Sequence, residues 1–189
     1  NAGDASDILL ESCGFSRNGY SGTDSSCIGR AHNIYVGNVR SFTMRGCHSH
    51  SALGEGHLVK SRARSNHILC NRLTEENDGQ ASYQLQLAEG GLSFVIGNLI
   101  EQGPGAANRS RIVCFADENQ NNPVQSLFFA NNTVVNDYGG SPGFVFCGGP
   151  APSGKVVNNL FIGSGTPAQA AGTALVVTNN LHLPYAART

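Results

Sequence analysis

The stretch GHLVKSRARSNHILCNRL, residues 56–73, contains the pattern that decides the fold. In its second half, the apolar residue Ile68 is followed three positions later by Asn71 and two positions after that by apolar Leu73. The same six-residue unit, with Asn or Cys in fourth place, recurs at 10–15, 44–49, 68–73, 95–100, 129–134, 156–161 and 177–182. In the unit at 44–49, Ser49 replaces the final apolar residue. Seven such units indicate a repeat architecture.

The spacing of the units restricts the architecture. Their fourth positions are 21 to 34 residues apart, at Cys13, Cys47, Asn71, Asn98, Asn132, Asn159 and Asn180. These intervals are too regular for a β-sandwich and too short for βαβ units, which need about 30 residues or more. Turns rich in Gly, Pro and Asn leave no room for a helix between units. A further short strand precedes five of the units by 9 to 15 residues, with Ile34, Val59, Leu85, Cys114 and Phe146 in equivalent places.

A right-handed parallel β-helix of about seven coils accounts for this pattern. We expect residues 1–189 to form a single all-β domain in which inward Asn and Cys side chains make a ladder, each hydrogen-bonding to the coils on either side. The six cysteines include no CxxC pair, and most lie beside strand residues, so we expect most to be reduced and buried. Cys13 and Cys47 would lie close enough to bond, and a stack of thiols is equally compatible.

Composition excludes several functions. A net charge of −1 without a basic cluster argues against nucleic-acid binding, and no apolar run has the length of a membrane span. The chain starts at Asn1 without a signal peptide, so we expect a processed chain or a fragment of a longer protein.

The sequence also resembles a known family. HNIYV at 32–36, GHLVKSRA at 56–63, ASY at 81–83 and GNLIEQGP at 97–104 resemble bacterial β-helix repeat proteins of the pectate-lyase-like superfamily, over residues 6–161. That superfamily contains polysaccharide lyases, glycoside hydrolases, epimerases, phage tailspikes and adhesins, so the resemblance implies contact with carbohydrate and a secreted or cell-surface location. This chain differs at Gln86, where related sequences often have Asp, and it begins mid-solenoid, without the N-terminal coils and cap.

Alternation along the additional strands predicts one polar outer face. With Ile34, Val59, Leu85, Cys114 and Phe146 inward, the residues pointing outward are Asn33, Tyr35, Lys60, Gln84, Gln86 and Phe115, and Arg62 continues the face. Such a stripe suits an extended sugar chain. Tyr35 or Phe115 would provide a ring platform, and the amide side chains would bind hydroxyl groups. We therefore predict Asn33, His57, Gln84, Gln86 and Phe115 as substrate-binding residues.

The cations on this face suggest a reaction. β-Elimination of a uronic acid needs a base, an acid and a cation that neutralises the carboxylate. Lys60 would be the base, Arg62 would neutralise the carboxylate and Tyr35 would be the acid. The alternative is that both cations are ordinary solvated residues of an exposed strand. His57 would stack on His32, either as a core pair or as a group that orients Tyr35 or Lys60.

Other chemistry is less well defined by the sequence. His48 and His50 face away from the core, but two ligands do not make a metal site, so no metal residue is predicted. The acidic groups at 75–78 and 117–118 leave calcium open as a cofactor. A glycoside hydrolase would need two carboxylates about 5–10 Å apart, which Asp117 together with Glu89 or Glu101 could supply.

These observations favour a polysaccharide lyase acting on a uronate-containing polymer. The alternative is a non-catalytic carbohydrate-binding or structural surface β-helix, and whether the protein is an enzyme stays open. The expected partner is a polysaccharide, with no nucleic acid and no membrane span. Since uncapped coil ends could stack between molecules, both a monomer and an end-to-end oligomer are compatible with the sequence.

Overall fold

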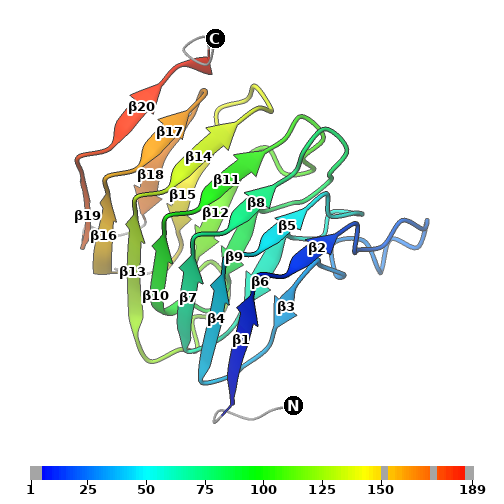
Figure 1. Cartoon of the computed structure of the whole chain (residues 1–189), viewed down its shortest axis with the longest axis horizontal. Coiled ribbons are helices and arrows are strands. Elements are labelled where there is room, and N and C mark those ends of the chain that lie inside the picture. The colour runs from blue at the N-terminus through cyan, green and yellow to red at the C-terminus, as the bar shows by residue number, and fades with distance from the viewer. Residues whose placement is uncertain (1–5, 150–152, 171–173, 186–189) are drawn as a thin grey trace.

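The protein is described here by a computed structural model that places residues 6–149, 153–170 and 174–185. Its strands form three sheets in which every pairing is parallel (Figure 1). Sheet A contains β1 (Asp7–Glu11), β4 (Ser41–Arg45), β7 (Ser65–Leu69), β10 (Gly91–Ile96), β13 (Gln125–Ala130), β16 (Ser153–Val157) and β19 (Leu175–Thr178). Sheet B contains β2 (Gly14–Ser16), β5 (His48–His50), β8 (Arg72–Thr74), β11 (Leu99–Gln102), β14 (Thr133–Asn136), β17 (Leu160–Ile162) and β20 (Leu181–Leu183). Sheet C contains β3 (Tyr35–Val36), β6 (Val59–Ser61), β9 (Leu85–Leu87), β12 (Arg111–Phe115), β15 (Gly143–Cys147) and β18 (Thr166–Ala170).

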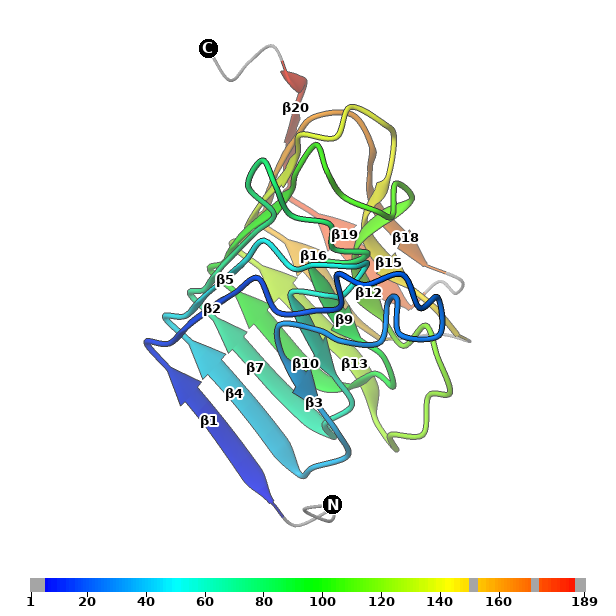
Figure 2. The same ribbon diagram turned by 90° about the vertical axis from the view of Figure 1, so that its right-hand side faces the viewer.

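Each strand pairs with the strand three places later in the chain, so each turn of the chain adds one strand to every sheet. This confirms the predicted right-handed parallel β-helix. Figure 2 shows the three sheets seen along the stack, with the long loops on the side where sheet B passes to sheet C. The first apolar residues of the seven units, from Leu10 to Val177, lie in one register across sheet A.

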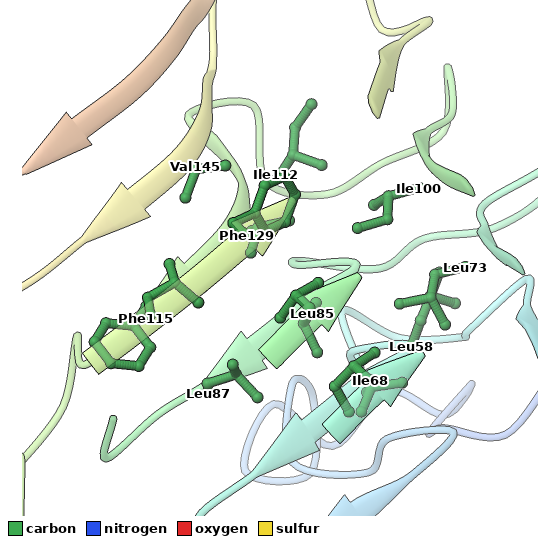
Figure 3. Close-up of a cluster of buried hydrophobic side chains, with 14 of the residues drawn as sticks. Leu58, Ile68, Leu73, Leu85, Leu87, Ile100, Ile112, Phe115, Phe129 and Val145 are labelled. Atoms are coloured by element: carbon green, nitrogen blue, oxygen red, sulfur yellow. The ribbon is translucent and has the colours of Figure 1, made fainter. Parts of the chain in front are cut away.

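Apolar side chains from all three sheets fill the interior. Ile68 and Phe129 from sheet A, Leu73 from sheet B, and Leu85 and Phe115 from sheet C are completely buried there (Figure 3). Stacking each coil on the next makes this core continuous along the solenoid.

The Asn ladder forms as predicted where the chain passes from sheet A to sheet B. Asn98 accepts hydrogen bonds at Oδ1 from the backbone N–H (2.8 Å) and the Nδ2 (3.0 Å) of Asn71. Its own Nδ2 donates to the Ile68 carbonyl and to Asn132 Oδ1, both at 2.9 Å. The pattern continues through Asn159 and Asn180. At the other end, the Cys13 N–H lies 3.4 Å from Cys47 Sγ.

The cysteines are only partly as expected. All six are unpaired. Cys47, Cys114 and Cys147 are buried, whereas Cys70 is exposed.

Ser49, which breaks the repeat, is explained by a polar contact inside the first coils. Its Oγ receives a hydrogen bond from Asn33 Nδ2 (3.1 Å) and donates to the Leu58 carbonyl (2.9 Å). A hydroxyl at this position therefore adds hydrogen bonds to two buried polar groups that an apolar side chain could not make.

The residue before each ladder position adopts a left-handed backbone conformation. These residues, Ser12, Gly46, Cys70, Gly97, Asn131, Asn158 and Asn179, have φ between 52° and 71°. Asn and Gly tolerate this region, whereas other side chains pay about 1–2 kcal/mol. This explains the repeated Asn-Asn pairs at 131–132, 158–159 and 179–180.

Replacing Cys70 with Asn is therefore expected to raise the free energy of unfolding by about 0.5–1 kcal/mol. The Cys70 side chain is exposed and adjoins Gly46 and Gly97 on the neighbouring coils, so the amide has room. Denaturant unfolding under reducing conditions measures the gain. Cys70→Ala, which keeps the backbone strain, is the matched control. Equal stability of the two variants would contradict the explanation.

Candidate functional site

The outer face of sheet C carries a column of residues in register. Tyr35, Lys60, Gln86, Cys114 and Phe146 occupy equivalent places on successive strands, from β3 to β15. Tyr35 is 55% exposed. The predicted outward orientation is therefore confirmed for Tyr35, Lys60 and Gln86, and we call these five residues the outer column.

Buried residues on either side of Lys60 fix the orientation of its strand, β6. Val59 and Ser61 on either side of Lys60 are completely buried, so alternation along β6 turns Lys60 outward. Ser61 Oγ donates to Asn66 Oδ1 (2.6 Å), whose Nδ2 donates to Ser93 Oγ (3.1 Å). This polar layer closes the corner between sheets C and A immediately after Arg62.

Lys60 and Arg62 are held by two carboxylates from later coils. Lys60 Nζ lies 2.6 Å from Glu118 Oε1, and Arg62 pairs with Glu89 Oε1 at 2.6 Å and with the other oxygen of Glu118. Arg62 Nε also donates to Tyr35 Oη at 3.0 Å. Burial by itself raises the pKa of Glu118, but the hydrogen bonds from Lys60 and Arg62 outweigh it and lower the pKa. The Glu118 carboxylate therefore stays ionised at neutral pH.

A second carboxylate lies beside Glu118. Gln86 is only 3% exposed, and its Nε2 donates to both carboxylate oxygens of Asp117 (3.1 and 3.0 Å) and lies 3.3 Å from Glu118 Oε1. Burial raises the pKa of Asp117. An aspartate at position 86 would add a third carboxylate to this group, whereas the amide donates to both. The presence of Gln86 is thus explained by its neighbours.

Two histidines stack behind the column, as predicted. The rings of His32 and His57 are 4.4 Å apart, and the His57 backbone N–H donates to His32 Nδ1 at 2.9 Å. Burial lowers the pKa of His32 to about 4 and that of His57 to about 3, so both rings are neutral at pH 7. His57 also contacts the Tyr83 ring and is almost completely buried.

A shallow pocket of about 330 Å³ lies at the start of the outer column. It is lined by Gly29, Arg30, His32, Tyr35, Lys60 and Arg62. All three residues predicted to be catalytic therefore border one space. Of the predicted substrate-binding residues, none lines this pocket, and Gln86 lies on the next coil of the column.

The predicted outward position of Phe115 is wrong. Val113, not Cys114, pairs with Leu85, and Phe115 is completely buried in the core. Likewise Val145 points inward in place of Phe146. A shift of one residue in register exchanges the two faces of a strand, so the inward and outward residues of β12 and β15 are the reverse of those predicted.

Gln84 and Asn33 were also predicted to point outward, and both are buried. Gln84 lies directly before β9, and the equivalent residues of the neighbouring coils are the buried Leu58 and Ile112. Neither the oxygen nor the nitrogen of its side-chain amide has a hydrogen-bond partner. Asn33 points to the interior, where Nδ2 reaches Ser49 and the His50 carbonyl. Both residues lie before the strand begins, where the chain still turns, so strict alternation does not apply to them.

The remaining candidate groups do not form one site. Of the carboxylates considered for a hydrolase, Glu101 lies on β11 in sheet B, apart from Asp117 after β12 in sheet C. Glu89, by contrast, belongs with Asp117 to the network around Glu118, and its carboxylate is paired with Arg62. His48 and His50 stack on each other at 4.4 Å on sheet B. Within the described ranges there is no group of three or more His, Cys, Asp or Glu residues arranged to hold a metal ion. Nor does any helix in the described part of the chain have the length and apolarity to cross a membrane.

Two features of the site were not predicted from the sequence. The pairing of Glu118 with Lys60 and Arg62 spans 58 and 56 residues of chain, and no local pattern indicates it. Arg30 comes from the long connection between β2 and β3, outside the repeat. A charged residue in an insertion beside the polar face is the only signal that could have suggested it.

No protein family, curated protein or solved structure matches this chain. The parallel β-helix is thus established by the structure, and the resemblance to the pectate-lyase-like superfamily stays a prediction.

Proposed function

We propose that this β-helix binds a polysaccharide at the edge of the outer face of sheet C, with one sugar unit in the pocket beside Tyr35. The observation that carries the proposal is that Tyr35, Lys60 and Arg62 line one pocket. An exposed aromatic ring beside charged hydrogen-bonding groups combines an apolar platform with polar anchors, which is the composition of a sugar site. The ion pairs fix Lys60 and Arg62, so little side-chain entropy is lost on binding.

The shape of the surface supports an extended ligand. Beyond Lys60 the outer column is covered, because Gln86 is 3% exposed and Cys114 is completely buried, so a ligand would extend from the pocket toward the loops between sheets B and C. Two further hollows of about 380 and 490 Å³ adjoin each other, sharing Glu55 and Ala107. The first of them includes Ile28, next to Gly29 of the pocket. A linear polymer can occupy such a series of shallow sites.

Lys60→Ala is expected to weaken polysaccharide binding about tenfold, because a hydrogen bond from a charged group contributes about 1.5–3 kcal/mol. Retention on a panel of immobilised neutral and acidic polysaccharides measures the effect. The chain has only one other lysine, Lys155, which is exposed on β16 of sheet A, so Lys155→Ala is the matched control. Equal losses in the two variants, or no retention of the parent protein on any polymer, would contradict the proposal.

β-Elimination is the second candidate, because the three predicted catalytic residues border the same pocket. Lys60 would remove the C5 proton of a uronate, Arg62 would neutralise its carboxylate, and Tyr35 would protonate the leaving oxygen. In the structure Glu118 pairs with both cations. The substrate carboxylate would therefore have to replace Glu118 on Arg62, and Lys60 would have to pass its proton to Glu118 before acting as a base.

Ultraviolet absorbance of unsaturated products tests elimination separately from binding. If the parent protein releases such products, Lys60→Ala should abolish them, and Lys60→Arg should not restore them because a guanidinium does not deprotonate. Retention without unsaturated products supports binding alone. The absence of both would leave a structural solenoid.

A further inference from the structure

Among the cations of the pocket, Arg30 differs from Lys60 and Arg62. Those two are neutralised by Glu118 and Glu89. Arg30 is exposed, and among the residues that the structure places no carboxylate forms an ion pair with it. The pocket therefore contains two compensated cations and one uncompensated cation.

The chain holds Arg30 in position through its backbone. The connection between β2 and β3 is the long blue loop on the right of Figure 1. Within it, the Gly29 N–H donates to the Gly54 carbonyl of the next coil (2.8 Å), which attaches the turn to the solenoid. The Arg30 N–H donates to the Cys27 carbonyl at 3.2 Å. Gly29 has φ of 74°, a conformation that a residue with a side chain rarely adopts.

None of the residues that line the pocket has a carboxylate side chain that would compete for the guanidinium of Arg30. His32 lines the pocket as a neutral ring, since its Nδ1 accepts the His57 N–H and its remaining nitrogen therefore carries the proton. Tyr35 contributes an exposed ring and a hydroxyl group that accepts from Arg62. Glu55, on the next coil, lies beside Gly29 and lines the two neighbouring hollows, but in the described part of the chain it forms no ion pair with Arg30.

We infer that Arg30 binds the negative group of an acidic sugar and so makes the site specific for anionic polysaccharides. A free guanidinium pairs with a carboxylate or a sulfate through two parallel hydrogen bonds, which a hydroxyl group of a neutral sugar does not match. The ion-paired side chains of Lys60, Arg62 and Glu118 then bind hydroxyl groups. This assignment rests on the proposed polysaccharide binding and names its substrate class.

The test compares Arg30→Gln with the parent protein on three immobilised polymers, a polyuronate, a sulfated glycan and a neutral glucan. Arg30→Gln is expected to lose at least tenfold in affinity for the preferred acidic polymer and to leave retention on the glucan unchanged. Arg30→Lys should recover part of the loss, because it restores the charge without the paired geometry. The parent affinity should fall with added salt more steeply than that of Arg30→Gln. Lys155→Ala is the control for a lost surface cation.

The outcomes separate this inference from the proposal beneath it. Binding of the acidic polymer that is equal in Arg30→Gln and the parent would overturn the role of Arg30 and leave polysaccharide binding intact. If the parent protein bound the neutral glucan more tightly than either acidic polymer, the role of Arg30 would likewise be overturned and polysaccharide binding would stand. No retention on any of the three polymers would overturn both. A larger loss on the polyuronate than on the sulfated glycan identifies the carboxylate as the recognised group, and the reverse identifies the sulfate.

Discussion

Asn98→Ala is expected to lower the free energy of unfolding by about 3–5 kcal/mol. The Asn98 side chain is buried and makes four hydrogen bonds, two to Asn71 and one each to Ile68 and Asn132. Alanine leaves the partners on both neighbouring coils without water to replace the lost bonds, and each buried polar group without a partner costs about 1–3 kcal/mol. Denaturant unfolding measures the loss.

Asn119→Ala is the matched control, because Asn119 is exposed in the loop after β12 and a surface change of this kind stays within about 0.5 kcal/mol. The double variant Asn71→Ala/Asn98→Ala should lose clearly less than the sum of its two single changes, since the two amides share hydrogen bonds. Additive losses, or a loss for Asn98→Ala no larger than that of the control, would show that the ladder does not stabilise the solenoid.

The ladder could be predicted because its chemistry repeats at one place in every coil. In the ladder the buried amides are satisfied by an amide, a thiol or a backbone group directly above and below them, so the sequence carries the same signal in all seven units. The neighbouring apolar positions of sheets A and B follow from it. The register of both sheets could therefore be read from one pattern.

The inward and outward faces of sheet C could not be predicted from β12 onward, for a physical reason. Four successive residues of β12, Ile112 to Phe115, are buried, so no polar residue marks its outer face. Cys114 points outward in register with Gln86, but it is completely buried beside Arg111 and Asp117. The outward ring of Phe146 in β15 is likewise covered, because Arg111 of β12 lies over it with Cζ 3.4 Å from the ring centroid. Alternation of apolar and polar residues disappears where the outer face is itself covered.

The candidate site was predictable only where it lies on strands. Alternation along β3 and β6 identified Tyr35 and Lys60, and Arg62 followed from them. Glu118 and Arg30 come from loops whose lengths vary from coil to coil. Their positions depend on backbone hydrogen bonds such as that from Gly29 to Gly54, for which the sequence has no periodic signal.

Glu75 is expected to make the stability of the protein depend on pH between about 4.5 and 7. Its side chain is completely buried between sheets B and C, Oε2 accepts from the Ala81 N–H (2.7 Å), and Oε1 has no partner. Burial raises its pKa from 4.5 to about 7. Below pH 4.5 the carboxyl group is protonated in the folded and the unfolded states alike. As the pH rises to 7, the unfolded chain ionises first, and the fold loses up to about 3 kcal/mol.

The difference between Glu75→Gln and the parent protein isolates this effect. The neutral His32 and His57 make the parent less stable below about pH 6.5, which opposes the trend from Glu75, but they act equally in both proteins. Glutamine keeps an oxygen for the Ala81 N–H and does not titrate. Relative to the parent, the variant should therefore gain about 3 kcal/mol between pH 4 and pH 8, measured by denaturant unfolding at each pH.

Glu76→Gln provides the opposite control in the same turn. The Glu76 carboxylate is partly exposed, and a hydrogen bond from Thr74 lowers its pKa despite some burial. An acid whose pKa is lowered stabilises the fold above its unfolded pKa, so this variant should lose a little stability relative to the parent as the pH rises. The prediction would be contradicted if Glu75→Gln also lost a little stability relative to the parent as the pH rises. Glu75 would then be ionised in the folded protein at neutral pH, and Oε1, which has no partner in the structure, would gain one by a local movement when the carboxylate forms.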